Sequence, residues 1–93
     1  MVYIKYEPQN SRAAAYDDGE FVGECDYLES DGVWTITHTC VNDDHQGQGI
    51  AGKLVKCVAE QARMNFASVF PVCSYAVTWF DRHPDYADVL SDR

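Results

Sequence analysis

The stretch Asp44-His45-Gln46-Gly47-Gln48-Gly49-Ile50-Ala51-Gly52-Lys53-Leu54-Val55 gathers glycines into a short loop and then continues in a helical pattern. A glycine-rich loop at the start of a helix presents backbone N–H groups that have no partner within the helix. Those groups and the positive end of the helix dipole together form an anion site, most often for phosphate. The stretch therefore predicts an anion-binding turn.

Downstream of the loop the hydrophobic residues recur with a helical period, which predicts a helix over residues 50–65 or 50–66. Its expected apolar stripe is Ala51, Leu54, Val55, Val58, Ala62 and Phe66, opposite Lys53, Lys56, Glu60 and Arg63. Residues 68–73 form a short apolar run, which predicts a strand parallel to the strand before the helix. Residues 75–83 predict a second helix stopped by Pro84, and residues 85–90 a last turn or short helix.

Upstream of the loop, residues 2–6, 21–28 and 33–41 are rich in the β-branched and aromatic side chains that strands favour. Residues 12–16 have helical propensity, but the turn signal at 17–20 makes a hairpin the better prediction. A second turn at 29–32 contains Asp-Gly, which supplies positive-φ positions. We therefore expect an antiparallel meander of four strands. Strict alternation divides the last strand into two faces: Trp34, Ile36, His38 and Cys40 against Thr35, Thr37 and Thr39.

Length and charge narrow the class of protein. The 93 residues are enough for a single domain, 1–93, and 46% hydrophobic content provides a core. A net charge of −8 makes nucleic acid an unsuitable partner and suits either a cationic substrate or simple solubility. The scattered Cys25, Cys40, Cys57 and Cys73 follow no apparent leader, so we expect free thiols in the cytoplasm. No apolar run approaches the ~20 residues of a membrane span, so no membrane partner is expected.

The loop and its flanks resemble the GCN5-related N-acetyltransferase (GNAT) superfamily. Gln46-x-x-Gly49-x-Ala51 matches that family's (Arg/Gln)-x-x-Gly-x-(Gly/Ala) pyrophosphate loop. Three further matches are typical of its small single-domain, YjdJ-type branch: His38-Thr39-x-Val41, Cys73-Ser74-Tyr75 and His83-Pro84-Asp85-Tyr86. The resemblance implies an α+β minimal GNAT fold, in which the antiparallel four-stranded meander is followed by a helix, a parallel fifth strand and a helix.

The resemblance also implies acetyl-coenzyme A as cosubstrate. Backbone amides of residues 46–52 would hold the pyrophosphate, and the end of the fourth strand would lie along the pantetheine, where the fourth and fifth strands splay apart. Glycines in the loop permit the close approach that a Cβ would block. The implied cofactor-binding residues are Thr39, Cys40, Val41, Gln46, Gly47, Gln48, Gly49, Ile50, Ala51 and Gly52.

The chain departs from the family pattern twice. Helices that usually wall the acceptor site between the first two strands are replaced by a few residues around 7–11. The acceptor site is then open, or completed by a large substrate or by a second copy in a homodimer. In the family motif Asn-x-x-Ala-x-x-x-Tyr, Cys73 replaces the Asn and Phe80 replaces the Tyr that protonates the leaving thiolate.

Three residues are candidates for the chemistry. Cys73 lies at a predicted helix start, which lowers a thiol's pKa, so it is a candidate acid or nucleophile, or else it packs beneath the cofactor. His38 is the candidate general base, with a half-buried structural histidine as the alternative. Tyr75 is the second candidate for the acid. His45 is expected to contact a cofactor phosphate or only solvent, and His83 to cap a helix end.

A metal site built from His38, Cys40, Asp43 and His45 lacks the paired spacing of zinc ligands, so no metal is expected. Two functions remain open. The first is an acetyl-coenzyme A-dependent acetyltransferase acting on a small amine or a peptide by direct attack in a ternary complex. The alternative is a coenzyme A-binding or protein-interaction module without catalysis.

Overall fold

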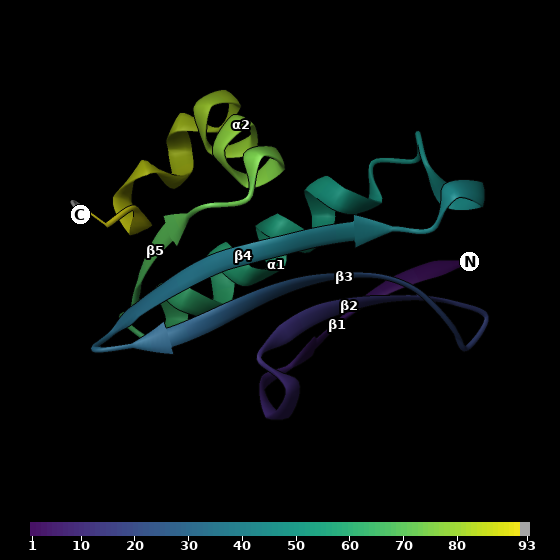
Figure 1. Cartoon of the computed structure of the whole chain (residues 1–93), viewed down its shortest axis with the longest axis horizontal. Helices are drawn as coiled ribbons and strands as arrows, with labels where there is room; N and C mark the ends of the chain where they lie inside the picture. Colours follow the sequence, from purple (N-terminus) through teal and green to yellow (C-terminus); the bar gives the residue numbers. More distant parts are fainter. Residues whose placement is uncertain (92–93) are drawn as a thin grey trace.

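The strands follow one another across the sheet in chain order. The computed structural model describes residues 1–91, and its five-stranded sheet has the order β1-β2-β3-β4-β5 (Figure 1). The strands are β1 (Val2–Glu7), β2 (Arg12–Asp17), β3 (Glu20–Ser30), β4 (Val33–Val41) and β5 (Ser68–Pro71). The first four pair antiparallel, and β5 pairs parallel to β4. The predicted α+β fold, a meander followed by a parallel fifth strand, is confirmed.

Two short hairpin turns set the register of the meander. Asp18 and Gly19 have φ values of 51° and 88°, and Asp31 and Gly32 have 53° and 79°. Positive φ at both central residues matches the twist of the flanking strands, and Asp-Gly is well suited to it. Both predicted hairpins are therefore present.

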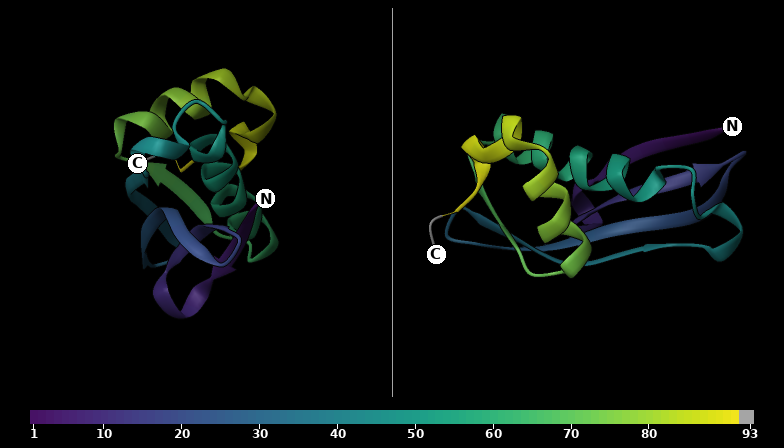
Figure 2. Two further views of the ribbon diagram at one scale, coloured as in Figure 1. Left: turned by 90° about the vertical axis from the view of Figure 1, so that its right-hand side faces the viewer. Right: turned by 90° about the horizontal axis from the view of Figure 1, so that it is seen from above.

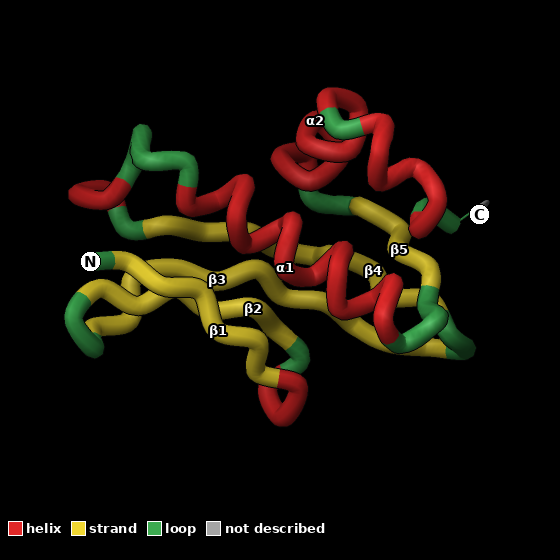
Figure 3. The backbone as a smooth tube through the Cα atoms, turned by 180° about the vertical axis from the view of Figure 1, so that it is seen from behind, coloured by secondary structure: helices red, strands yellow, loops and turns green. Residues whose placement is uncertain are grey.

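Two helices cover one face of the sheet. The helix α1 (Ile50–Met64) contacts all five strands and lies in front of the sheet in Figure 3. The helix α2 (Ser74–Arg82) and the 3₁₀ helix η3 (Pro84–Val89) lie on the same side as α1 (Figure 2). On the other face, the aromatic side chains of Tyr3 and Phe21 are 51% and 40% exposed. That face is left open to solvent.

The buried stripe of α1 differs at its ends from the expected one. Its buried residues are Ile50, Leu54, Val55, Val58, Ala59 and Ala62. Phe66 was expected on the stripe, but its side chain is 99% exposed. The helix ends at Met64 and Phe66 adopts a left-handed φ of 57°, so its side chain leaves the helical period.

A β-bulge in β4 changes which residues share a face. Asp26 pairs with His38 and Tyr27 with Ile36, which leaves Thr37 without a partner in β3. An extra residue in one strand reverses the alternation beyond it. Thr39 therefore lies on the helix-covered face with Ile36, and its hydroxyl contacts the buried thiol of Cys25. The prediction that His38 and Cys40 share a face with Trp34 and Ile36 is wrong.

The connection between β1 and β2 is a single short turn. It consists of the 3₁₀ helix η1 (Pro8–Asn10) and Ser11, so nothing in this segment walls the uncovered face. Within the described residues, no helix is long and apolar enough to cross a membrane.

Candidate functional site: a trough around the glycine loop

The glycine loop opens α1 with its amides exposed. It follows the 3₁₀ helix η2 (Asp43–His45), and Gly47 and Gly49 have φ values of 79° and 75°. Gly49 is the N-cap of α1, and no side chain among residues 1–91 caps the first turn. Glycine adopts this backbone conformation without the strain that a Cβ would bring. The free N–H groups at the start of α1 are thus available to an anion.

Three adjoining hollows form a trough around this loop, with Tyr75 lining all of them. The first, about 330 Å³, is at the end of β4 and is lined by Thr39, Cys40, Val41, Asp43, Gln46 and Ala51. The second, about 230 Å³, is lined by Val41, His45, Gln46, Gly47, Gly49, Ile50 and Ala51. The third, about 370 Å³, lies between α1 and α2 and is lined by Gly49, Gly52, Lys53, Lys56, Trp79, His83, Asp85 and Tyr86.

The sheet opens beside the first hollow. Pairing between β4 and β5 ends at Ile36 and Pro71, whereas β4 continues to Val41. The amides of Val72 and Cys73 both donate to the carbonyl of Ile36, at 3.0 and 3.1 Å. Proline cannot donate to the ladder, and the chain then turns into α2. Beyond Ile36, no described strand therefore pairs with β4 on its β5 side.

Cys73 lies at this opening as the N-cap of α2. Its thiol is 3.6 Å from the hydroxyl of Thr39, which lines the first hollow. Partial burial raises the pKa of the Cys73 thiol, but its hydrogen bonds with the backbone amide of Ala76, the side chain of Thr39 and the backbone amide of Tyr75 outweigh that effect. The net result is a lowered pKa, as expected for a thiol at a helix N-terminus.

Cys25 has the opposite character. Its sulfur lies 3.6 Å from the same Thr39 hydroxyl, but the residue is fully buried. Burial raises the pKa of the Cys25 thiol to about 12. Of the two thiols that flank Thr39, only Cys73 is therefore suited to proton transfer or nucleophilic attack.

His38 lies on the uncovered face, away from the trough. It is exposed and pairs across the strands with Asp26. Burial raises the pKa of Asp26 to about 6, and a hydrogen bond to Glu24 adds to this effect. The structure therefore separates the two candidates: the thiol of Cys73 contacts Thr39, which lines the first hollow, whereas His38 lies on the uncovered face.

Gly52 of α1 faces α2 without a side chain. A Cβ at this position would lie 3.3 Å from the Tyr75 hydroxyl and 3.4 Å from the Trp79 indole nitrogen. The absence of a side chain at Gly52 thus keeps the third hollow open. His83 closes the far end of α2 as its C-cap, with Nδ1 2.7 Å from the carbonyl of Trp79.

Nine of the ten residues predicted to bind the cofactor line the trough, and Gln48 does not. Sequence reasoning missed Lys53 and Lys56 as trough residues. The lysines were assigned to the solvent face of α1, and only the position of α2 shows that this face borders the third hollow. Among residues 1–91, no three His, Cys, Asp or Glu side chains are grouped as a metal site requires.

Comparisons with known proteins agree with this fold. The family model described as GCN5-related N-acetyl-transferase matches residues 12–89. A GCN5-like protein from Staphylococcus aureus, solved by NMR, is 31% identical, with 96% of this chain and 87% of that chain covered and a TM-score of 0.74. No curated protein matches the chain significantly. The chain therefore belongs to the GCN5-related N-acetyltransferase family; its assignment to the YjdJ-type branch stays a prediction.

Two more distant structures share the fold and contain the cofactor. A GNAT family acetyltransferase from Elizabethkingia anophelis, with acetyl-CoA bound, is 16% identical, with 89% of this chain and 73% of that chain covered and a TM-score of 0.65. N-acetylglutamate synthase from Neisseria gonorrhoeae, complexed with coenzyme A and N-acetylglutamate, is 18% identical, with 78% and 18% covered and a TM-score of 0.66.

Proposed function

We propose that residues 1–93 act as one minimal domain that transfers the acetyl group of acetyl-coenzyme A to an amine. The observation that carries this proposal is the continuous trough, which runs from the opening between β4 and β5, past the glycine loop, to the groove between α1 and α2. Each part offers the chemistry that one part of coenzyme A requires, and proteins of similar fold hold the same cofactor.

The pyrophosphate would lie at the amides of residues 46–52, at the start of α1. The pantetheine would follow the free edge of β4 at Thr39 to Val41. The adenosine end would occupy the third hollow, where Lys53 and Lys56 supply positive charge in a chain of net charge −8. A local pair of cations is needed there, because the overall charge repels an anionic cofactor.

In the proposed reaction the amine nitrogen attacks the carbonyl carbon of the thioester. The tetrahedral intermediate collapses, the carbon–sulfur bond breaks, and the amide and the coenzyme A thiolate are formed. Cys73 gives its proton to that thiolate, since its lowered pKa brings it closer to the working pH, where acid catalysis is most efficient. Tyr75 is the second candidate for this role, because its side chain lines every part of the trough.

The acceptor would approach from the uncovered face. His38 lies on that face at the bulge in β4, close to where β5 diverges, and would accept the proton that the attacking amine loses. Asp26 and Glu24 border it with acidic groups that attract a protonated amine. Because the short η1 turn builds no wall there, a peptide or a small amine has access, and a second copy of the chain in a homodimer could complete the site.

The binding part of the proposal is tested by thermal unfolding with and without millimolar acetyl-coenzyme A. A ligand that binds only the folded state raises the melting temperature. We expect a rise with coenzyme A and acetyl-coenzyme A, and no rise with either would overturn the proposal.

The chemistry is tested by thiol release with a panel of amines and peptides. Cys73→Ala is expected to lower kcat by about 10² to 10⁴, the usual contribution of a general acid. Cys57→Ala is the matched control, since this thiol lies on α1 outside the trough. His38→Gln should lower the rate of thiol release, because glutamine cannot accept the proton that the amine loses. Parallel initial-rate lines, or an acetylated Cys73 peptide, would assign Cys73 the nucleophile's role instead.

One observation favours the alternative of a coenzyme A-binding module without turnover. Phe80, which replaces the family's tyrosine, is 5% exposed and lies in the core, so it brings no hydroxyl to the trough. Cofactor binding without thiol release for any acceptor in the panel would support that reading.

A further inference from the structure

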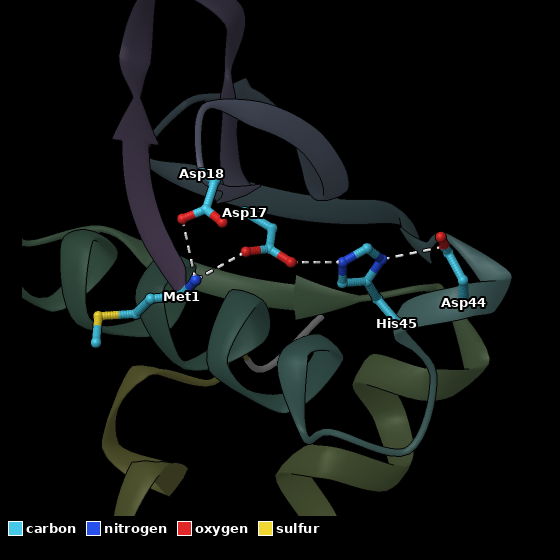
Figure 4. Close-up of polar contacts among 5 residues, drawn as sticks. All are labelled: Met1, Asp17, Asp18, Asp44 and His45. Carbon is cyan, nitrogen blue, oxygen red and sulfur yellow. Dashed lines mark hydrogen bonds and ion pairs between the residues drawn. The ribbon is translucent and has the colours of Figure 1, made fainter.

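The side chain of His45 lies between the end of β2 and the glycine loop (Figure 4). Its Nε2 is 2.9 Å from a carboxylate oxygen of Asp17, and its Nδ1 is 3.1 Å from a carboxylate oxygen of Asp44. The imidazole is only 14% exposed. This side chain was expected to meet a cofactor phosphate or solvent, but the structure places it between two carboxylates.

Two carboxylates on the two ring nitrogens favour the charged form of histidine. Only the imidazolium donates from both nitrogens at once. The hydrogen bond to Asp17, followed by the one to Asp44, raises the pKa of His45. The N-terminal ammonium and then His45 lower the pKa of Asp17. Both contacts therefore favour the ion-paired form of the link between β2 and the loop.

The position of this ion pair along the chain allows it to restrict the conformation of the glycine loop. His45 immediately precedes Gln46 and lines the second hollow together with Gly47 and Gly49. On the other side, the side-chain Nε2 of Gln46 donates to the carbonyl of Val41 at 2.9 Å. A loop with two glycines at positive φ has many alternative conformations when it is not held, and ordering it on binding costs affinity.

We propose that the Asp17–His45 ion pair is a positioning device for the pyrophosphate loop, which it ties to the end of β2 so that the loop amides are preorganised for the diphosphate of coenzyme A. The inference rests on the proposed function, in which this loop receives that diphosphate. Asp17 and His45 act through the loop and need not touch the cofactor.

Cofactor affinity should then depend on pH in a defined direction. A raised histidine pKa means that the contact is complete below the pKa of an unfolded histidine and is lost as pH rises through the raised value. The lowered pKa of Asp17 means that the contact also fails in acid. The charged groups around the imidazole are Asp17 of β2, Asp44 of η2 and, through Asp17, the ammonium of Met1, with Asp18 beside it.

Two neighbouring aspartates provide a matched pair of variants. Both Asp17 and Asp18 bond the N-terminal ammonium, but only Asp17 reaches His45. Asp18 has a φ of 51°, which Asn tolerates, so the same substitution is possible at both. Coenzyme A dissociation constants would be measured by calorimetry for wild type, Asp17→Asn and Asp18→Asn from about pH 5.5 to about pH 9, the range in which histidine titrates.

We expect Asp17→Asn to weaken coenzyme A binding about tenfold near pH 6.5, the size of one charge-assisted hydrogen bond. Asp18→Asn should bind as wild type does. The ratio of the Asp17→Asn dissociation constant to the wild-type one should shrink as pH rises through the His45 titration. The titration of the cofactor's own phosphates affects both constants equally, so it cancels in that ratio. NMR of the imidazole should give a lower His45 pKa in Asp17→Asn than in Asp18→Asn.

Variants of His45 separate positioning from simple folding. His45→Ala should weaken binding about as much as Asp17→Asn, and the double variant should lose little more, because both changes break one contact. His45→Gln, whose amide retains a donor, should recover part of the affinity. Suppose that wild type binds coenzyme A. If Asp17→Asn and His45→Gln then bind it as tightly as wild type does at every pH, the ion pair has no positioning role. If wild type does not bind coenzyme A at all, the proposed function fails and this inference falls with it.

Discussion

Replacement of Glu7 by glutamine is expected to reduce the free energy of unfolding by about 2 kcal/mol at neutral pH. Glu7 is a buried charged residue at the end of β1, only 4% exposed. Its carboxylate accepts hydrogen bonds from the Tyr16 hydroxyl at 2.6 Å, from the Arg12 guanidinium at 2.7 Å and from the Asn10 amide at 3.3 Å. These donors hold together the short β1–β2 connection that replaces the usual acceptor wall.

The magnitude follows from the titration of Glu7. The Tyr16 hydrogen bond, followed by the Arg12 hydrogen bond, lowers its pKa from 4.5 to about 2. At about 1.4 kcal/mol for each pKa unit, a difference of this size corresponds to about 3 kcal/mol. The hydrogen-bond network of Glu7 lies on the face of the sheet that the helices do not cover. There the Arg12 side chain is 24% exposed, so solvent screens the charges. We therefore discount the value to about 2 kcal/mol.

The pH dependence has a definite sign. A carboxylate with a depressed pKa in the folded state stabilises above its unfolded pKa, and that contribution disappears as pH falls through the folded value. The difference between wild type and Glu7→Gln should therefore be constant above about pH 5 and shrink progressively toward about pH 2.

Urea unfolding followed by tryptophan fluorescence, repeated from neutral pH downward, measures this difference directly. Glu29→Gln is the control, since Glu29 is an exposed residue of β3 distant from Arg12 in the register. The free energy of unfolding of Glu29→Gln should equal that of wild type. The reasoning fails if Glu7→Gln unfolds within about 0.5 kcal/mol of wild type at neutral pH, the range of an ordinary surface change, or if its deficit persists unchanged in acid.

Two further predictions concern the groove between the helices. Gly52→Ala should leave the melting temperature unchanged or raise it, because alanine gains about 1 kcal/mol of helix propensity. Coenzyme A affinity should fall, because the new Cβ would lie 3.3 Å from the Tyr75 hydroxyl and 3.4 Å from the Trp79 indole nitrogen; unchanged affinity by calorimetry would contradict this. Joint replacement of Lys53 and Lys56 by alanine should weaken the binding of coenzyme A about tenfold. The binding of dephospho-coenzyme A should weaken much less, because this ligand lacks the 3′-phosphate that the two lysines would contact. Equal losses for the two ligands would show that these lysines do not contact the 3′-phosphate.

Much of the fold was predictable because its signals are local. Asp-Gly pairs specify tight hairpins through their backbone conformation, and both hairpins are found where predicted. Hydrophobic period identifies α1 and α2 to within a residue or two of their observed ends. The glycine loop falls at the start of α1, where its amides have no side-chain cap.

The predictions failed where a rule based on neighbouring residues was overridden by the pairing of segments distant in the chain. Alternation along β4 assumes an unbroken register, but β3 leaves Thr37 unpaired and reverses the faces beyond it. His38 therefore lies across the sheet from Cys73. Likewise, the helical stripe extended to Phe66 only because periodicity does not show where a helix ends.

By itself, the sequence determined that a glycine loop opens a helix after an antiparallel meander, because turn chemistry and periodicity act over a few residues. Only the tertiary structure decided what surrounds that loop. It brought Asp17 of β2 to His45, α2 to the lysine face of α1, and Thr39 between the thiols of Cys25 and Cys73. These contacts join residues far apart in the chain, so no local pattern encodes them, and packing and strand register alone set their geometry.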